Sequence, residues 1–84
     1  MPDTEKIRVY GTRWCPDCRR AKQVLDRHNI PFLWIDIEDD AAAMSYVQKV
    51  NGGYRSVPTI VFPDGSVLVE PANEALEKKL AGIK

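Results

Sequence analysis

The apolar periodicity of residues 6–37 changes twice, which limits the folds that the chain can adopt. Residues 6–10 alternate apolar and polar side chains and include β-branched residues, a pattern that predicts a strand ending at Gly11. Residues 16–28 carry apolar side chains at three- and four-residue spacing, as in a helix with one buried face. Residues 32–37 form an almost unbroken apolar run, typical of a strand covered on both faces. Strand, helix and strand within about 30 residues predict a crossover that joins parallel strands.

A second helix is predicted directly after the second strand. Asp39 and Asp40 can cap it, because a carboxylate oxygen can accept from the free N–H groups of a first helical turn. The helix is expected over 41–47. It stops at Asn-Gly-Gly, residues 51–53, which are residue types that accept the left-handed backbone of a helix C-terminus.

The last part of the chain predicts a hairpin and a third helix. Two short apolar runs, 59–62 and 66–69, flank Pro-Asp-Gly at 63–65, a sequence that favours a turn between antiparallel strands. Apolar residues at helical spacing then predict a helix over 72–83. The predicted order is βαβαββα. Because 84 residues can hold only one core, we expect a single α/β domain, 1–84.

Only two cysteines are present, Cys15 and Cys18, and they lie three residues apart. A small secreted scaffold would need several disulfides spread through the chain, so this pair is expected to be chemical rather than structural. A zinc site needs four ligands, and the rest of the chain offers one histidine, His28, and no second Cys-x-x-Cys. We therefore expect no metal site within one chain.

The charge balance excludes several classes of partner. Twelve basic residues match twelve acidic ones, whereas nucleic acid and anionic membranes attract a one-sided positive charge. Residues 1–6 are polar, and no apolar run approaches the length of a signal peptide or a membrane span. We therefore expect a monomeric cytoplasmic protein that binds neither nucleic acid nor membranes.

The Cys-Pro-Asp-Cys motif falls where the first strand has ended and the first helix begins, at the carboxyl edge of the predicted sheet. If Cys15 caps this helix, its sulfur faces free N–H groups and the positive end of the helix dipole, which favour a thiolate. Pro16 suits the first helical position. Cys18 shares the inward stripe with Ala21 and Leu25. Cys15 is thus predicted to be the exposed nucleophile, and Cys18 the shielded resolving thiol, of disulfide exchange.

Two other interpretations of the motif stay open. The cysteines could form half of a metal or iron-sulfur site shared between two chains, or they could be incidental to an interaction module. Metal and sulfide counting after anaerobic purification would identify the shared site. A Cys15→Ser variant with intact function would identify the module.

The sequence Thr-Arg-Trp-Cys-Pro-Asp-Cys at 12–18, with Ser-Val-Pro-Thr at 56–59, resembles the glutaredoxins over nearly the whole chain. This resemblance implies a thioredoxin-like fold, a four-stranded mixed sheet flanked by three helices, and thiol-disulfide oxidoreductase activity without a bound cofactor. It also implies that the bond before Pro58 is cis, and that the backbone of Val57 pairs with the incoming thiol or peptide. Cluster-binding glutaredoxins usually replace the proline found here as Pro16, which argues against a cluster.

Two further features of the resemblance concern the thiol that serves as co-substrate. Glutathione-using glutaredoxins usually carry a lysine where this chain has Thr12, and a Gly-Gly-x-Asp type element where it has residues 68–73. Residues 50–59 and Trp14 are more similar to the mycoredoxins, actinobacterial members that reduce mixed disulfides with mycothiol. The resemblance therefore implies reduction of mixed disulfides between proteins and a low-molecular-weight thiol, with mycothiol favoured over glutathione.

The two residues between the cysteines keep an alternative open. Mycoredoxins typically have Gly-Tyr at this place, whereas this chain has Pro16 and Asp17. The Trp-Cys-Pro-Asp-Cys sequence at 14–18 also occurs in some thioredoxin-related proteins. A third relative, the glutaredoxin-like electron donor to ribonucleotide reductase, takes electrons from thioredoxin reductase, a flavin disulfide reductase, but its usual C-terminal element has no counterpart here. The alternative is a general reductant of protein disulfides that depends on thioredoxin reductase. The resemblance permits this role as well.

Several residues around the motif are candidates to bind the thiol. Trp14 could form an apolar wall beside the nucleophile. Arg55 and Arg13 offer guanidinium groups that can bind a carboxylate or act on the thiolate, although solvated loop arginines would look the same in sequence. The predicted contacts to the thiol are Arg13, Trp14, Pro16, Arg55, Val57 and Pro58.

Overall fold

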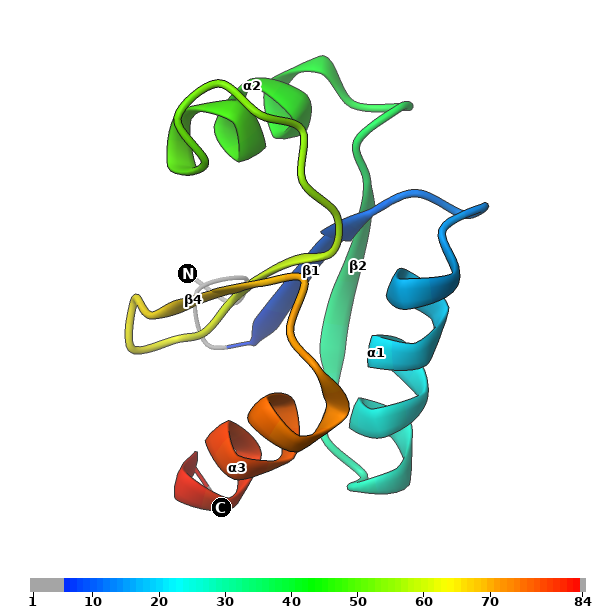
Figure 1. Ribbon diagram of the computed structural model, residues 1–84, viewed down its shortest axis with the longest axis vertical. Helices are drawn as coiled ribbons and strands as arrows, with labels where there is room; N and C mark the ends of the chain where they lie inside the picture. Colours follow the sequence, from blue (N-terminus) through cyan, green and yellow to red (C-terminus); the bar gives the residue numbers. More distant parts are fainter. Residues whose placement is uncertain (1–5, 84) are drawn as a thin grey trace.

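The computed structural model describes residues 6–83 and has the predicted order of elements (Figure 1). The elements are β1 (Ile7–Gly11), α1 (Pro16–Arg27), β2 (Phe32–Asp36), α2 (Ala41–Val50), β3 (Thr59–Val61), β4 (Val67–Val69) and α3 (Asn73–Ile83). No helix in this part of the chain is both long and apolar enough to cross a membrane.

The four strands form one mixed sheet in the order β2-β1-β3-β4. β1 and β2 are parallel, and their register pairs Ile7 with Phe32 and Gly11 with Asp36. β3 runs antiparallel to both β1 and β4. The predicted crossover between parallel strands and the predicted hairpin are therefore both present. Gly11 is the last residue of β1, so it belongs to the strand that it was predicted to end.

The predicted cover of β2 on both faces is present but incomplete. Every one of its residues is half-buried, because β2 forms an edge of the sheet and pairs only with β1. Its side chains do reach both faces: Phe32 and Trp34 pack against one hydrophobic core, and Ile35 packs against the other. An apolar run therefore identified the contacts of this strand but not its open edge.

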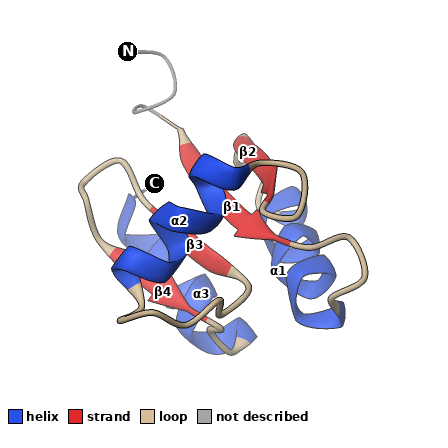
Figure 2. Ribbon diagram, turned by 90° about the horizontal axis from the view of Figure 1, so that it is seen from above, coloured by secondary structure: helices blue, strands red, loops and turns tan. Residues whose placement is uncertain are grey.

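Each face of the sheet carries its own core (Figures 1 and 2). Helices α1 and α3 cover one face, and α2 covers the other. β1 contributes to both cores, since alternate side chains of a strand point to opposite faces. The first core contains Ile7, Val9, Ala21, Val24, Leu25, Ile60, Phe62, Leu76 and Leu80. The second contains Tyr10, Ile37, Ala43, Val47 and Val61.

Local residue chemistry explains where α2 begins and ends. The Asp40 side chain caps the helix by accepting from the N–H of Ala43 at 3.0 Å. The helix runs to Val50, beyond the predicted range of 41–47, and the chain then turns through Gly52 and Gly53, whose φ values are 65° and 102°. These left-handed conformations suit glycine, so the predicted termination is confirmed.

Candidate active site

The dithiol lies at the start of α1, in the turn that follows β1. Cys15 is the N-cap residue of the helix, with extended backbone angles (φ −84°, ψ 116°), and Pro16 takes the first helical position. The Cys15 Sγ accepts a hydrogen bond from the backbone N–H of Cys18 at 3.3 Å. The sulfur of Cys15 thus takes the place of the usual capping oxygen, at the positive end of the helix dipole.

One of the two thiols is more buried than predicted. Cys18 is fully buried, as expected, but Cys15 is only 7% exposed, so the prediction of an exposed Cys15 is wrong. The reason is the loop before β3, which lies over the start of α1: the Cys15 Sγ is 4.0 Å from the carbonyl oxygen of Val57. An incoming disulfide must therefore approach Cys15 along a restricted path beside this loop.

The two sulfurs have different surroundings. Burial raises the pKa of the Cys18 thiol from 9.0 to about 12, and the hydrogen bond with the Cys15 side chain adds to the increase. Cys18 therefore remains a neutral thiol at neutral pH. Cys15 instead receives an N–H hydrogen bond from the helix terminus, a contact that favours a thiolate. The pair is chemically asymmetric even though both residues are buried.

The raised pKa of Cys18 predicts a loss of stability at alkaline pH in the reduced protein. In the unfolded chain this thiol ionises around pH 9.0, whereas in the folded chain it ionises around pH 12. Its contribution is therefore complete below pH 9 and is lost as pH rises towards 12, because the unfolded state releases its proton first. Under reducing conditions, the free energy of unfolding should decrease more between about pH 8 and about pH 10.5 in wild type than in Cys18→Ala. Equal losses would contradict the assignment.

Cys18 packs tightly against the end of β1 and the ring of Trp34. A Cβ atom placed on Gly11 would lie 2.6 Å from the Cys18 Sγ and 2.8 Å from Cη2 of Trp34. The ammonium group of Lys22 lies 3.9 Å from the centre of the Trp34 ring, in cation–π range. Glycine at position 11 is therefore required by close packing around the resolving thiol.

We expect Gly11→Ala to destabilise the protein by about 1–3 kcal/mol, the usual cost of overpacking. The added methyl group must displace either Cys18 or the Trp34 ring. Urea unfolding of the reduced protein measures this cost. Gly82→Ala is the matched control, because Gly82 lies in α3 and a Cβ there meets no atom within 4 Å. Equal stability of the two variants would contradict the packing argument.

The loop before β3 has a defined conformation beside the dithiol. The Val57–Pro58 peptide bond is cis, as the resemblance implied. The Thr59 hydroxyl donates to the carbonyl of Ser56 at 2.7 Å, and Asn51 donates to the same hydroxyl oxygen at 3.1 Å. Pro58 is buried. These contacts fix the backbone of the loop where it passes over Cys15.

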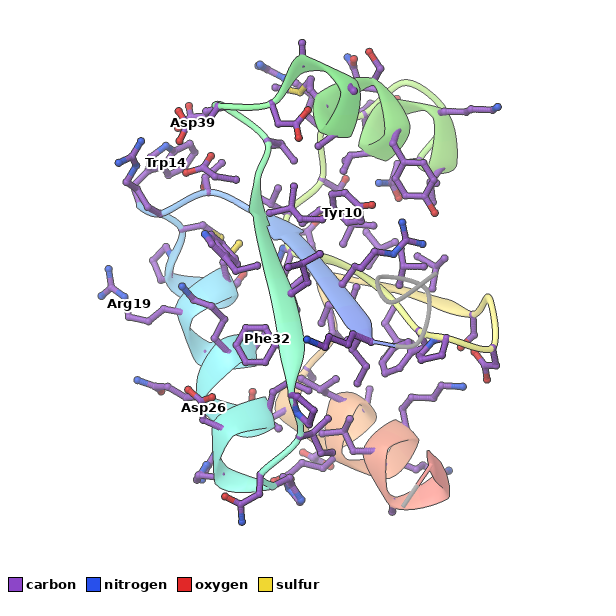
Figure 3. All side chains as sticks on the ribbon, turned by 180° about the vertical axis from the view of Figure 1, so that it is seen from behind. Tyr10, Trp14, Arg19, Asp26, Phe32 and Asp39 are labelled. Carbon is purple, nitrogen blue, oxygen red and sulfur yellow. The ribbon has the colours of Figure 1, made fainter. Side chains whose placement is uncertain are left out.

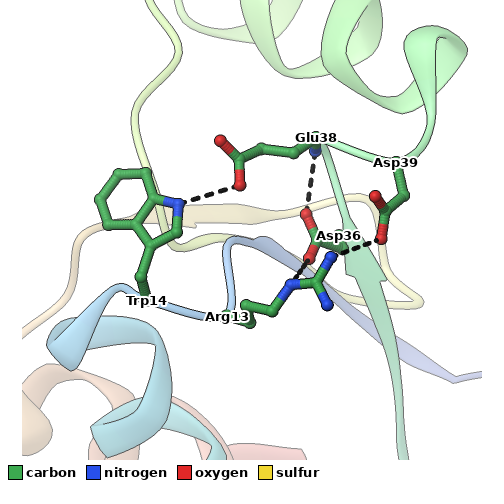
Figure 4. Close-up of polar contacts among 5 residues, drawn as sticks. All are labelled: Arg13, Trp14, Asp36, Glu38 and Asp39. Atoms are coloured by element: carbon green, nitrogen blue, oxygen red, sulfur yellow. Dashed lines mark hydrogen bonds and ion pairs between the residues drawn. The ribbon is translucent and has the colours of Figure 1, made fainter.

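A second loop meets the dithiol turn, and sequence reasoning missed it. Residues 36–40, here called the acidic loop, run from the last residue of β2 to the start of α2, and Figure 4 draws Asp36, Glu38 and Asp39. Trp14 donates its indole N–H to Glu38 at 2.9 Å. Arg13 contacts Asp36 at 3.5 Å and Asp39 at 3.3 Å. The four acids within 36–40 carried this signal, because parallel pairing places the end of β2 beside the end of β1.

These contacts change the interpretation of Arg13. Its guanidinium group turns towards the carboxylates of Asp36 and Asp39 (Figure 4), so it holds the dithiol turn against the acidic loop. Figure 3 shows Trp14 and Asp39 together at the same end of the molecule. Arg13 also lines a broad hollow of about 610 Å³ along β2, but neither cysteine lines it.

A smaller cavity of about 140 Å³ lies between the dithiol turn, the acidic loop and the loop before β3. It brings together three of the predicted thiol contacts, Trp14, Arg55 and Val57. Pro16 is exposed at the start of α1 and does not line it. The complete lining is Thr12, Trp14, Ile37, Glu38, Met44, Arg55 and Val57.

Thr12 lines this cavity and carries a buried hydroxyl. The residue is only 4% exposed, and its hydroxyl oxygen has no hydrogen-bond partner within residues 6–83. Buried polar atoms are nearly always paired, so an unpaired one next to a cavity needs an explanation. Within the same residues, no group of three or more His, Cys, Asp or Glu side chains could hold a metal ion.

Comparison with known proteins agrees with this geometry. The family model "Glutaredoxin" matches residues 7–68. A Mycobacterium tuberculosis protein named as a glutaredoxin is 41% identical over 80 residues, covering 95% of each chain. Mycoredoxin 1 of Corynebacterium glutamicum is 37% identical over 73 residues, which cover 86% of this chain and 90% of the relative.

Solved structures show the same fold. A crystal structure of a thioredoxin-like protein superimposes with a TM-score of 0.76 at 34% identity, covering 87% of this chain and 97% of the other. The glutaredoxin of Archaeoglobus fulgidus gives a TM-score of 0.71 at 27% identity and covers 88% and 84%. The chain therefore has a thioredoxin-like fold and belongs to the glutaredoxin family of thiol oxidoreductases.

Proposed function

We propose that this protein reduces mixed disulfides between proteins and a low-molecular-weight thiol, with mycothiol preferred over glutathione. The observation that carries the proposal is the asymmetric dithiol: Cys15 receives an N–H hydrogen bond at the start of α1, and Cys18 is a fully buried neutral thiol behind it. Thiolate attack by one sulfur and resolution by the other is the chemistry that such a pair performs.

The reaction begins at Cys15. Its thiolate attacks the sulfur of the low-molecular-weight thiol in the mixed disulfide, and the protein substrate leaves as a thiolate that then takes up a proton. The new disulfide joins Cys15 to the small thiol. A second molecule of that thiol attacks this bond, which forms the disulfide of two small thiols and releases the Cys15 thiolate. Alternatively, Cys18 attacks the bond, which forms the Cys15–Cys18 disulfide and releases the small thiol. The electrons move between sulfurs, so no bound cofactor is needed.

The loop before β3 is the natural place for the substrate backbone. The N–H of Val57 has no hydrogen-bond partner within residues 6–83, and its carbonyl faces only the Cys15 sulfur. A peptide-like group beside Cys15 can pair with these two groups. Trp14 and Arg55, which line the adjoining cavity, are the proposed side-chain contacts to the thiol.

The proposed preference for mycothiol rests on the absence of a lysine at position 12 and on the similarity to a mycoredoxin. Thr12 stands where glutathione-using glutaredoxins carry a lysine, so a cation for a tripeptide carboxylate is missing at that place. The similarity to mycoredoxin 1 supports the same choice. We propose that the protein acts as a monomer in the cytoplasm, a reducing compartment in which thiols stay reduced.

The test is NADPH-coupled reduction of one protein mixed disulfide at equal protein concentration with three electron sources: mycothiol, glutathione and thioredoxin reductase. The proposal predicts turnover with mycothiol well above that with glutathione, each thiol being recycled by its own reductase. Turnover driven by thioredoxin reductase alone would instead identify a general reductant of protein disulfides. No turnover with any source would contradict the proposed reaction.

A further inference from the structure

The cavity beside the dithiol has a charged group on each of two opposing loops. Glu38 comes from the acidic loop between β2 and α2, and Arg55 comes from the loop between α2 and β3. Neither side chain makes an ion pair within residues 6–83, and the two are not paired with each other. The cavity is therefore lined by one uncompensated anion and one uncompensated cation.

The position of Glu38 is well defined. Its backbone N–H donates to the Asp36 carboxylate at 2.9 Å, and the N–H of the buried residue Ile37 donates to the Gly11 carbonyl at 3.0 Å. Its carboxylate accepts from the Trp14 indole at 2.9 Å (Figure 4). These contacts keep a negative charge at the wall of the cavity.

The carboxylates of the neighbouring acids, unlike that of Glu38, are used in ion pairs or in a helix cap. Asp36 and Asp39 share the guanidinium group of Arg13, and Asp40 is used to cap α2. A neutral indole N–H orients the Glu38 carboxylate without cancelling its charge. Glu38 is thus the acid of this loop whose charge a ligand in the cavity would meet.

We propose that Glu38 and Arg55 together select an uncharged thiol and that Glu38 is the residue that disfavours anionic ones. This inference rests on the proposed function and concerns the charge of the group that enters the cavity. An anionic ligand is attracted to Arg55 but repelled by Glu38, so the two effects oppose each other. A neutral amide can donate to Glu38 and accept from Arg55, and it gains from both.

The size of the cavity limits what this selection can act on. About 140 Å³ corresponds to the liquid volume of roughly five water molecules, which accommodates a cysteinyl group but not a whole tripeptide. The selection therefore acts on the charge of the small group that enters the cavity, which neither cysteine lines.

The experiment uses two substrates that differ in one charge. A single-cysteine peptide is joined by a disulfide to N-acetylcysteine, which has a carboxylate, or to N-acetylcysteine amide, which is neutral. The measured quantity is the ratio of kcat/KM for the neutral to the anionic substrate. Wild type should favour the neutral one, and the preference should shrink at high salt because exposed charges are screened.

Two variants should shift this ratio in opposite directions. Glu38→Gln keeps an acceptor for the Trp14 indole but removes the charge, so the ratio should fall by about threefold to fivefold, the range that partly exposed charges usually give. Arg55→Gln should raise it by a similar factor. Asp26→Asn changes net charge equally on α1, far from Trp14 and Asp39 (Figure 3), and should leave the ratio unchanged.

The outcomes separate this inference from the proposed function. If wild type reduces neither substrate, the proposed function is wrong. If wild type reduces both and neither the Glu38 nor the Arg55 variant moves the ratio, the reaction stands and the selection by Glu38 is wrong. A ratio that moves equally in the Asp26 variant would also overturn it, because the effect would then come from net charge.

Discussion

A Cys15→Ser variant should lose reduction of mixed disulfides by at least about a thousandfold, the scale typical for loss of a covalent nucleophile. A serine hydroxyl stays protonated at neutral pH and does not attack disulfide sulfur, so the first step is blocked. The substitution exchanges one small side chain for another at the helix cap and should leave the fold intact. The measurement is the rate of thiol release from a protein mixed disulfide at saturating low-molecular-weight thiol.

Cys18→Ser is the matched variant for this prediction. It keeps the attacking sulfur, and free thiol can still regenerate Cys15, so turnover of mixed disulfides should persist. Reduction of a disulfide within a protein should fail, because that reaction needs Cys18 to release the trapped intermediate. If Cys18→Ser were the more damaging of the two for mixed disulfides, the assignment of nucleophile and resolving thiol would be reversed.

The second large effect is expected in the core beneath the dithiol helix. Leu25 lies on the buried face of α1 and is fully buried with Phe62 and Leu80. Leu25→Ala should cost about 2–5 kcal/mol, through lost apolar burial and the cavity that remains. A chain of 84 residues has a total stability of only about 4–13 kcal/mol, so this loss should remove a large fraction of it.

Urea unfolding followed by circular dichroism measures this cost under reducing conditions. Gln23→Ala is the control, since Gln23 is exposed on the same helix and the change should stay within about 0.5 kcal/mol of wild type. Similar midpoints for the two variants would mean that α1 does not depend on its buried face.

The sequence predicted the helices well because their signals are local. Cys15 and Pro16 mark the start of α1, and Asp40 marks the start of α2. The turn at 63–65 is equally local: Gly65 has a φ of 89° and donates to the carbonyl of Phe62 at 2.9 Å. Residue type and spacing alone determine such features, so no knowledge of distant contacts was needed.

Features that depend on strand neighbours were predicted less well. The apolar run of β2 indicated contacts on both faces, which exist, but its place at the edge of the sheet depends on which strand lies beside it. The burial of Cys15 has the same origin. It depends on Val57, 42 positions later in the chain, whose loop covers the sulfur.

In the candidate site, too, the local features were predicted and the contacts between distant residues were not. The dithiol and the loop at Val57 and Pro58 were predicted from motif and resemblance. The contacts of Trp14 with Glu38 and of Arg13 with Asp36 were not, because they form only when parallel pairing brings the ends of β1 and β2 together. These contacts could have been expected from the sequence. The strand before the Cys-Pro-Asp-Cys motif was predicted to pair in parallel with the next strand, and a cluster of acids lies at the end of that next strand.

The central claim is that Cys15 takes the small thiol, rather than the protein, from a mixed disulfide. Intact-mass measurement after Cys18→Ser reacts with a protein carrying mycothiol in disulfide linkage tests this most directly, because this variant cannot release the intermediate by itself. The account predicts Cys15 joined to mycothiol, with the substrate protein released in reduced form. A covalent complex between Cys15 and the substrate protein, or no adduct at all, would contradict it.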